Sequence, residues 1–299
     1  MTKVAKLQAG VALLWAITLF AGWRPLVDTL ALSLRNDEYT YILLILPVSA
    51  ALIFLEWQSL STMLAPSVRA GSAILAIAAL IAGSTLVWSA SLPSDVKLSI
   101  RMVALVVSWI GAFVLCLGSR ASRRILFPLC FLFGLVPLPQ LVFNQVITWL
   151  QQGSSCSAYL LFAMFGVPVT HDGVLLTIPT LTVQVAQECS SIRSSSMLLV
   201  TTMVLAQLLL VTPWRKALVI GIAVPLSIAK NGLRIFTIAM LGTRVDRGYL
   251  TGRFHHQGGI VFFAIALIAI FVILWFLHRG EDSSMRSDMN LVKATAAGD

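Results

Sequence analysis

Residues 258–278 read GGIVFFAIALIAIFVILWFLH and contain no Asp, Glu, Lys or Arg. A helix of about 20 apolar residues crosses the hydrocarbon layer of a bilayer, so this stretch predicts a membrane-spanning helix. Further candidate spans lie upstream, at 7–23, 40–57, 71–92, 99–118, 124–139, 189–212 and 215–242. The sequence therefore predicts an all-α polytopic membrane protein with about eight transmembrane helices.

The composition of the whole chain agrees with this fold class. Of its 299 residues, 58% are hydrophobic and 11% are charged, and the mean hydropathy is +0.92. So few polar side chains cannot cover the surface of a water-soluble globule. The formal charge of +9 is spread between the apolar runs, where cations fix membrane orientation. Because no separate basic domain remains, we expect no nucleic-acid partner.

The distribution of Lys and Arg also predicts the topology. If the N-terminus is cytoplasmic, most basic residues, including the cluster at 120–124, fall on the cytoplasmic side. Eight spans then return the C-terminus to the cytoplasm. We expect one membrane domain over residues 1–280, with an outer insertion at about 140–188. The polar residues 281–299 are expected to form a disordered cytoplasmic tail.

The insertion is predicted to contain a small outer-face helix and a β-hairpin. Residues 141–166 have apolar side chains at helical spacing, interrupted by Asn and Gln, which is typical of a helix in the membrane interface. Residues 173–187 are rich in β-branched side chains and contain a Pro-Thr turn. This pattern predicts a hairpin that leads directly to Cys189.

Three polar clusters are expected to meet on the outer side of the membrane. They lie at the start of span six (188–193), within span seven (230–234) and at the start of span eight (253–259). A cation in hydrocarbon is costly unless it faces a polar cavity or a partner. Lys230, Asn231 and Arg234 therefore predict the wall of an anion or oxyanion pocket. An arginine that snorkels to the interface would give the same pattern.

Cys189 is the candidate nucleophile. The N-terminal end of a helix and nearby cations favour the thiolate, and a histidine such as His255 or His256 can serve as its base. Glu188 could pair with a neighbouring arginine or oppose formation of the thiolate. An unreactive interfacial cysteine and histidine caps are the alternatives. The chain's four cysteines show no CxxC pair or metal-ligand spacing, so no metal, cofactor or disulfide framework is predicted.

Taken together, these residues resemble the exosortase/archaeosortase family of polytopic membrane cysteine transpeptidases. The resemblance covers roughly residues 130–275. It depends on three motifs in order, CSSIR (189–193), NGLR (231–234) and HHQGG (255–259). Ser191 stands where a glycine is common in the family, so the approach of the backbone at that point could differ.

The resemblance implies a cysteine protease or transpeptidase, a hydrolase of protein sorting in the bacterial cytoplasmic (inner) membrane. Its substrates would be exported proteins with a PEP-CTERM-type C-terminal signal, which comprises a short motif such as Pro-Glu-Pro, one span and a basic tail. Cys189 would form a thioester, Arg234 would stabilise the oxyanion or orient the thiolate, and His255 would shuttle the proton, with His256 as its rival. Arg193 would line the pocket. An acceptor of unspecified identity would resolve the acyl-enzyme.

Other functions fit parts of the pattern. A transporter could bind an anionic substrate through Arg234, Lys230 and Asn231, although the chain has no repeated halves and its polar residues gather at one face. A serine intramembrane protease could use Ser194 or Ser196, but neither has a GxSxG context. A scaffold for envelope biosynthesis would remain active without the cysteine thiol.

Overall fold

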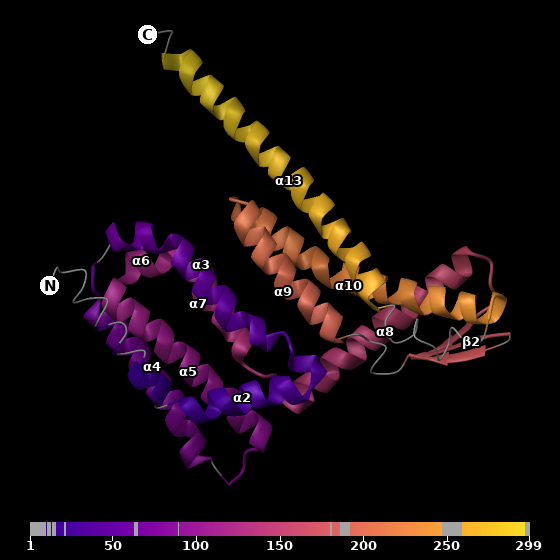
Figure 1. The fold of residues 1–299 in the computed structure, drawn as a ribbon, viewed down its shortest axis with the longest axis horizontal. Helices are drawn as coiled ribbons and strands as arrows, with labels where there is room; N and C mark the ends of the chain where they lie inside the picture. Colours follow the sequence, from indigo (N-terminus) through magenta and orange to yellow (C-terminus); the bar gives the residue numbers. More distant parts are fainter. Residues whose placement is uncertain are drawn as a thin grey trace. The chain divides into compact units, whose positions relative to one another are not determined.

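The computed structural model describes residues 10, 13, 16–20, 22–62, 65–88, 90–179, 181–185, 192–246 and 259–296 (Figure 1). Most of these residues are helical. Within them, six helices are long and apolar enough to cross a membrane: Asp37–Leu60, Val68–Val87, Ser94–Leu117, Ile192–Leu209, Pro213–Arg244 and Gly259–Glu281. Each corresponds to one predicted span, so the structure supports a helical, polytopic membrane protein.

The two remaining predicted spans have different outcomes. The first, 7–23, is described only in part, at residues 10, 13, 16–20, 22 and 23. The segment 124–139 is not one straight span, because helix α7 (Leu126–Phe131) and the 3-10 turn η2 (Leu132–Leu135) bend by 99° into helix α8 (Gln140–Met164). Prolines 137 and 139 explain the bend, since each lacks a backbone N–H donor and disfavours helix at the preceding residue. Counted as one span, this bent pair would raise the described total to seven.

The chain divides into two compact units, Met1–Phe143 and Asn144–Asp299, where the sequence predicts a single domain. Each unit is considered separately. The first unit contains α2 (Trp23–Arg35), η1 (Asp37–Tyr39), α3 (Ile42–Thr62), α4 (Val68–Val87), α5 (Ser94–Leu117), α6 (Ser119–Arg124), α7 and η2. Helix α2 was not predicted from the sequence. At 13 residues it is about 20 Å long, too short to cross the bilayer.

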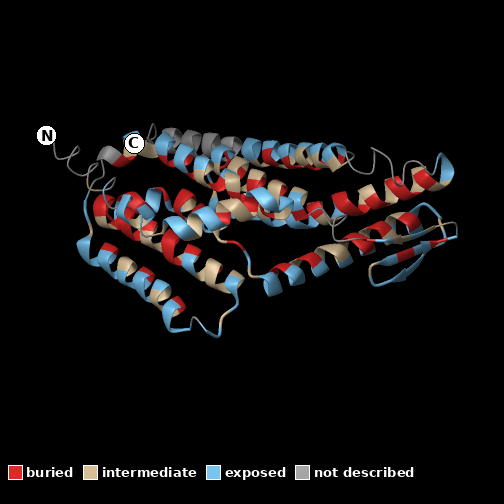
Figure 2. Ribbon diagram, turned by 60° about the horizontal axis from the view of Figure 1, so that its bottom comes forward, coloured by how far each residue is buried: buried red, intermediate tan, exposed pale blue. Residues whose placement is uncertain are grey.

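Helix α5 forms the centre of the first unit and packs against α2, α4 and η2. Its side chains include the fully buried Trp109, and buried and exposed positions alternate along most helices (Figure 2). Residues near the start of α5 also stabilise the bend between η2 and α8. Ser99 donates to the carbonyl of Pro137 at 2.6 Å, and the Asp95 carboxylate accepts the backbone N–H of Gln140 at 2.8 Å. These bonds satisfy backbone groups that the break in the helix leaves open.

A three-stranded antiparallel sheet follows α8 in the second unit. It comprises β1 (Thr170–Asp172), β2 (Leu175–Ile178) and β3 (Leu181–Gln184), in the order β1-β2-β3. The run at 173–187 with the predicted turn thus contains the paired strands β2 and β3. Buried and exposed residues alternate along β2. Its buried Leu176 and Ile178 belong to the same core as Phe162 of α8 and Ile235 of α10.

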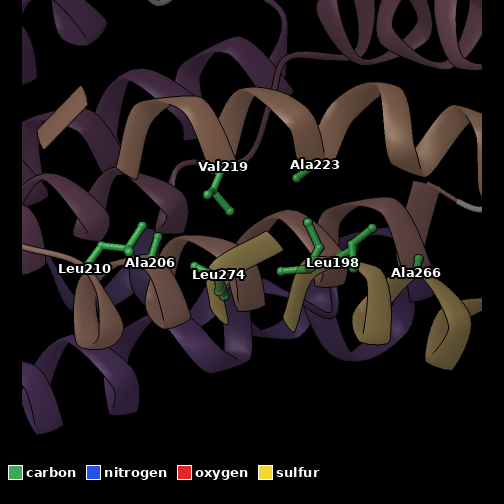
Figure 3. Close-up of a cluster of buried hydrophobic side chains, with 8 residues drawn as sticks. Leu198, Ala206, Leu210, Val219, Ala223, Ala266 and Leu274 are labelled. Carbon is green, nitrogen blue, oxygen red and sulfur yellow. The ribbon is translucent and has the colours of Figure 1, made fainter. Parts of the chain in front are cut away.

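A second core joins α9 (Ile192–Leu209), α10 (Pro213–Arg244) and α13 (Gly259–Ala296). Figure 3 shows its buried side chains, which come from all three helices. Many are small, such as Ala206, Ala223 and Ala266. Small residues allow helix backbones to approach closely, which drives helix association in membranes.

The turn between α9 and α10 is tied to α13 by Glu281. This residue is 4% exposed, and its carboxylate accepts the backbone N–H groups of Val211 at 2.9 Å and Thr212 at 2.8 Å. Arg215 donates to the carbonyl of Leu277 at 2.6 Å. Helix α13 accordingly continues to Ala296, where the sequence predicted a disordered tail from residue 281. Extending an existing helix requires no new nucleation, and this anchored end supports the extension.

Gly232 sets the distance between α10 and α8. A Cβ atom at this position would overlap the Ser157 side chain and lie 2.9 Å from the backbone nitrogen of Ala158. We expect Gly232→Ala to force the helices apart and to reduce stability by about 1–3 kcal/mol. Thermal unfolding of the purified protein in detergent would measure the loss.

Gly221, on the same helix, is the matched control for that substitution. A Cβ atom there would meet no heavy atom within 4 Å. Because alanine has the higher helix propensity, Gly221→Ala should leave the Tm unchanged or raise it slightly. Equal Tm values for the two variants would contradict the close contact between α10 and α8.

Candidate active site

Helix α10 carries polar residues between its two apolar contact regions. Near its start it packs into the α9–α10–α13 core through Val219 and Ala223, and near its end into the α8–sheet core through Ile235 and Ala239. The polar residues between these regions are Ser227, Lys230, Asn231 and Arg234. Their spacing of three and four residues places most of them on one face of the helix.

Two side-chain hydrogen bonds join this face to the first turn of α9. Lys230 is 6% exposed, and its Nζ donates to Ser194 Oγ at 2.5 Å. Ser227 Oγ donates to Ser195 Oγ at 2.6 Å. Because both acceptors lie within four residues of the start of α9, these bonds fix where α9 begins relative to the middle of α10.

Asn231 connects the same region to α8. Its side chain is 1% exposed, and its Nδ2 donates to Ser154 Oγ at 2.9 Å. Its Oδ1 is buried and has no hydrogen-bond partner among the described residues. Buried polar atoms are nearly always paired, so this oxygen is available to a donor that the described residues do not supply.

Helix α8 also holds the end of the sheet. Gln151, about one turn before Ser154, donates from Nε2 to the carbonyl of Val185 at 3.1 Å. Val185 follows β3 directly. Helices α8 and α10 therefore fix the chain on both sides of residues 186–191, at Val185 through α8 and at Ser194 through α10.

Arg234 follows Lys230 by one turn, about 6 Å farther along α10. It is partly exposed, whereas Arg193 in the first turn of α9 is exposed. Lys230 forms no salt bridge with any residue that the structure describes. A buried cation needs a compensating charge or hydrogen bonds, so this region is suited to an anion or to an oxyanion that develops during a reaction.

The structure tests only part of the predicted constellation. It brings Lys230 and Asn231 into one hydrogen-bonded region with the start of α9. Glu188, Cys189, His255 and His256 lie outside the described residues, so the meeting of all three polar clusters stays a prediction.

The described ends of α9 and α13 nevertheless have a defined relationship. Leu198, early in α9, and Ala266, early in α13, belong to one core, and Figure 3 shows them close together. Farther along, Leu210 and Leu274 share that core as well. The two helices therefore run parallel, and the chain enters both from the same end of the bundle.

Sequence reasoning did not identify the hydrogen bonds that organise this region. It considered Ser194 and Ser196 as rival nucleophiles and Gln151 as a polar residue of an interfacial helix, and it did not consider Ser154 or Ser227. The available signal was the spacing of polar residues on one face of α8, at 151, 154 and 155. Such residues within an apolar helix often bond across to a neighbouring helix.

Comparison with known proteins gives one match. The family model described as Transmembrane exosortase (Exosortase_EpsH) matches residues 23–272, which include α8, the sheet, α9, α10 and the first part of α13. No curated protein and no solved structure matches the chain. Since the matched region covers most of the sequence and both structural units, the chain belongs to the transmembrane exosortase family.

Proposed function

We propose that this protein is a membrane cysteine peptidase and transpeptidase that cleaves C-terminal sorting signals of exported proteins. The observation that carries the proposal is the hydrogen bonding of α8, α9 and α10 on both sides of residues 186–191. This segment contains Cys189, and the residues that flank it are bonded to α8 at Val185 and to α10, which carries Arg234, at Ser194. Family membership supports the same class of reaction.

Chain connectivity limits how far the thiol can lie from this region. Consecutive Cα atoms are 3.8 Å apart, so the Cα of Cys189 lies within about 11 Å of that of Ile192 and about 15 Å of that of Val185. Arg234 is about 6 Å along α10 from Lys230, which binds Ser194. We propose that, within this range, the Cys189 thiol and the Arg234 guanidinium act on the same substrate carbonyl.

In the proposed reaction, the Cys189 thiolate attacks the backbone carbonyl carbon beside the sorting motif. A C–S bond forms, and Arg234 donates hydrogen bonds to the resulting oxyanion. When the tetrahedral intermediate collapses, the C–N bond breaks and His255 gives its proton to the leaving amine. The amine departs with the substrate's span and basic tail. An acceptor nucleophile then attacks the thioester, passes its proton to His255 and releases the thiolate.

The other site residues have supporting roles in this proposal. Lys230 and Asn231 hold the first turn of α9 and α8 around the reacting centre, and Arg193 binds an acidic residue of the motif. Glu188 pairs with Arg193 or with Arg234. His256 is the alternative proton shuttle.

We further propose that the site faces the outside of the inner membrane, with both termini in the cytoplasm. The basic residues Arg215, Lys216 and Arg279 support this orientation, because they lie at the opposite end of the α9–α10–α13 bundle from Ser194. Arg215 and Arg279 also stack on the rings of Trp214 and Trp275, at 5.5 and 4.7 Å. Cations mark cytoplasmic ends, and tryptophan is enriched at membrane interfaces.

The test is co-expression with a reporter that carries a Pro-Glu-Pro motif, one span and a basic tail. The protein should shorten this reporter, and the acylated intermediate should be released by hydroxylamine, which cleaves thioesters. A second reporter keeps the span and tail but has alanines in place of the motif. Shortening of both reporters alike would contradict cleavage at a sorting motif.

The bond between Lys230 and Ser194 gives a further prediction. Loss of a hydrogen bond to a charged group costs about 1.5–3 kcal/mol, so Lys230→Met should slow reporter processing by about 10–100-fold. Because both residues act through one bond, the double variant with Ser194→Ala should lose little more than Lys230→Met alone.

Initial processing rates, corrected for membrane abundance, would measure this coupling. Lys216→Met is the matched control, because Lys216 lies on the same helix and donates to Gln207 at the other end of the bundle. Additive losses in the double variant would show that Lys230 and Ser194 act independently.

A further inference from the structure

The first unit contains a cavity of about 770 Å³ between α2, α4 and α5. We propose that this cavity binds a membrane phospholipid with a net negative headgroup. The proposal does not depend on the proposed enzymatic function, because every residue assigned to that function lies in the second unit. It rests on the length, the lining and the charges of the cavity.

Short side chains create the space. On α4 the cavity is lined by Ala78, Ala79, Ala82 and Gly83, and a Cβ atom added at Gly83 would meet no heavy atom within 4 Å. The volume lies in the range of small-molecule sites, about 300–1,000 Å³. An apolar lining offers water few hydrogen-bond partners, so the walls favour a hydrocarbon occupant.

The dimensions of the lining match one leaflet of a bilayer. On α4 it extends from Leu86 to Leu75, which is about 16 Å at 1.5 Å per residue. The hydrocarbon core of a bilayer is about 30 Å thick, so the cavity spans about half of it. Thr85 lies in the last turn of α4, which places this end of the cavity near the membrane surface.

Cations gather at the cavity. Arg101 lines it about two turns after the start of α5, and its Nε donates to Thr85 Oγ1 in a long bond of 3.4 Å. Arg101 forms no salt bridge with the residues described in the first unit. A guanidinium inside a membrane span normally has an anionic or polar partner, and its planar donors match a phosphate group.

Arg24 is the second cation in the lining, and it lies 5.7 Å from the centre of the Trp23 ring, which lines the cavity too. Tryptophan and arginine are typical of the headgroup region. One lipid can therefore satisfy both features, with its phosphate at Arg101 and Arg24 and an acyl chain along the alanines of α4.

The test is native mass spectrometry of the full chain in detergent, titrated with phosphatidylglycerol or with phosphatidylcholine of the same acyl chains. We expect tighter binding of phosphatidylglycerol. Arg101→Gln should weaken that binding at least about tenfold, since it removes charge-assisted hydrogen bonds. Gly83→Phe should weaken the binding of both lipids, because its ring fills the cavity while the open space at Gly83 lets the helix fold.

Two substitutions outside the cavity serve as controls. Arg69→Gln removes an exposed cation from the first turn of α4, and Gly221→Phe adds a ring at an equally open glycine of α10. Neither should change lipid binding. Equal affinity for the two lipids, or unchanged phosphatidylglycerol binding by Arg101→Gln, would overturn the anionic headgroup. Unchanged lipid binding by a folded Gly83→Phe protein would overturn the cavity as the site.

Discussion

Replacement of Cys189 by alanine is expected to abolish reporter processing while the protein remains in the membrane at wild-type abundance. Without the thiol no acyl-enzyme can form, and loss of a catalytic nucleophile costs about 10⁶-fold in a well-studied hydrolase. The residual rate would be undetectable by immunoblot. Cys189→Ser should be nearly as defective, because a serine hydroxyl is far less acidic than a thiol and is a much weaker nucleophile near neutral pH.

The matched control for this experiment is Cys156→Ala. Cys156 is an exposed free cysteine of α8 in the same unit, so its loss reports any general effect of removing a thiol. It should process the reporter at the wild-type rate. A Cys189→Ala protein that still shortens the reporter would rule out the cysteine mechanism and would leave Ser194 or Ser196 as the nucleophile to examine.

Replacement of Arg234 by alanine should lower the rate of acylation by about 10²–10³-fold, the usual cost of removing an oxyanion donor. The loss should appear in kcat, with little change in KM, because the oxyanion exists only along the reaction path. Arg234→Lys should restore only part of the rate, since an ammonium lacks the planar pair of donors. Accumulation of the hydroxylamine-sensitive intermediate in a single turnover measures this step.

Arg244→Ala, an exposed arginine in the last turn of the same helix, is the control for charge on α10. It should retain the wild-type kcat. If Arg234→Ala instead raised KM and left kcat unchanged, the guanidinium would bind the substrate equally in the ground state and the transition state. Its role would then be recognition of the sorting signal.

The sequence predicts most of the helical framework because hydropathy measures what a membrane span must satisfy. It fails at 124–139, since a hydropathy window counts apolar residues and does not report whether they form one straight helix. The prolines at 137 and 139 showed where a helix should stop, but not that the chain would turn by 99° into α8. Helix α2 was not predicted for another reason: its 13 residues are fewer than the roughly 20 apolar residues that indicate a membrane span.

The sequence also singles out the polar residues of α10. Lys230, Asn231 and Arg234 could be found because polar groups inside an apolar helix are costly and therefore need a purpose. Their partners Ser194 and Ser154 are 36 and 77 positions away in the sequence. Such pairs depend on the register between packed helices, which no local pattern determines.

The bonds of Glu281 have a consequence for how the two ends of the bundle communicate. An α-helix resists stretching along its axis, so a displacement of α13 at Glu281 moves the whole apolar part of the helix by the same amount. His255 precedes Gly259, the first residue of α13, by four positions in the sequence. In the proposed topology Glu281 and His255 lie at opposite surfaces of the membrane, so the bonds of the Glu281 carboxylate would set the depth of the histidine. Because the family match ends at residue 272, a chain shortened to that boundary would keep the proposed catalytic residues. It would lose Glu281 and its bonds to the turn between α9 and α10.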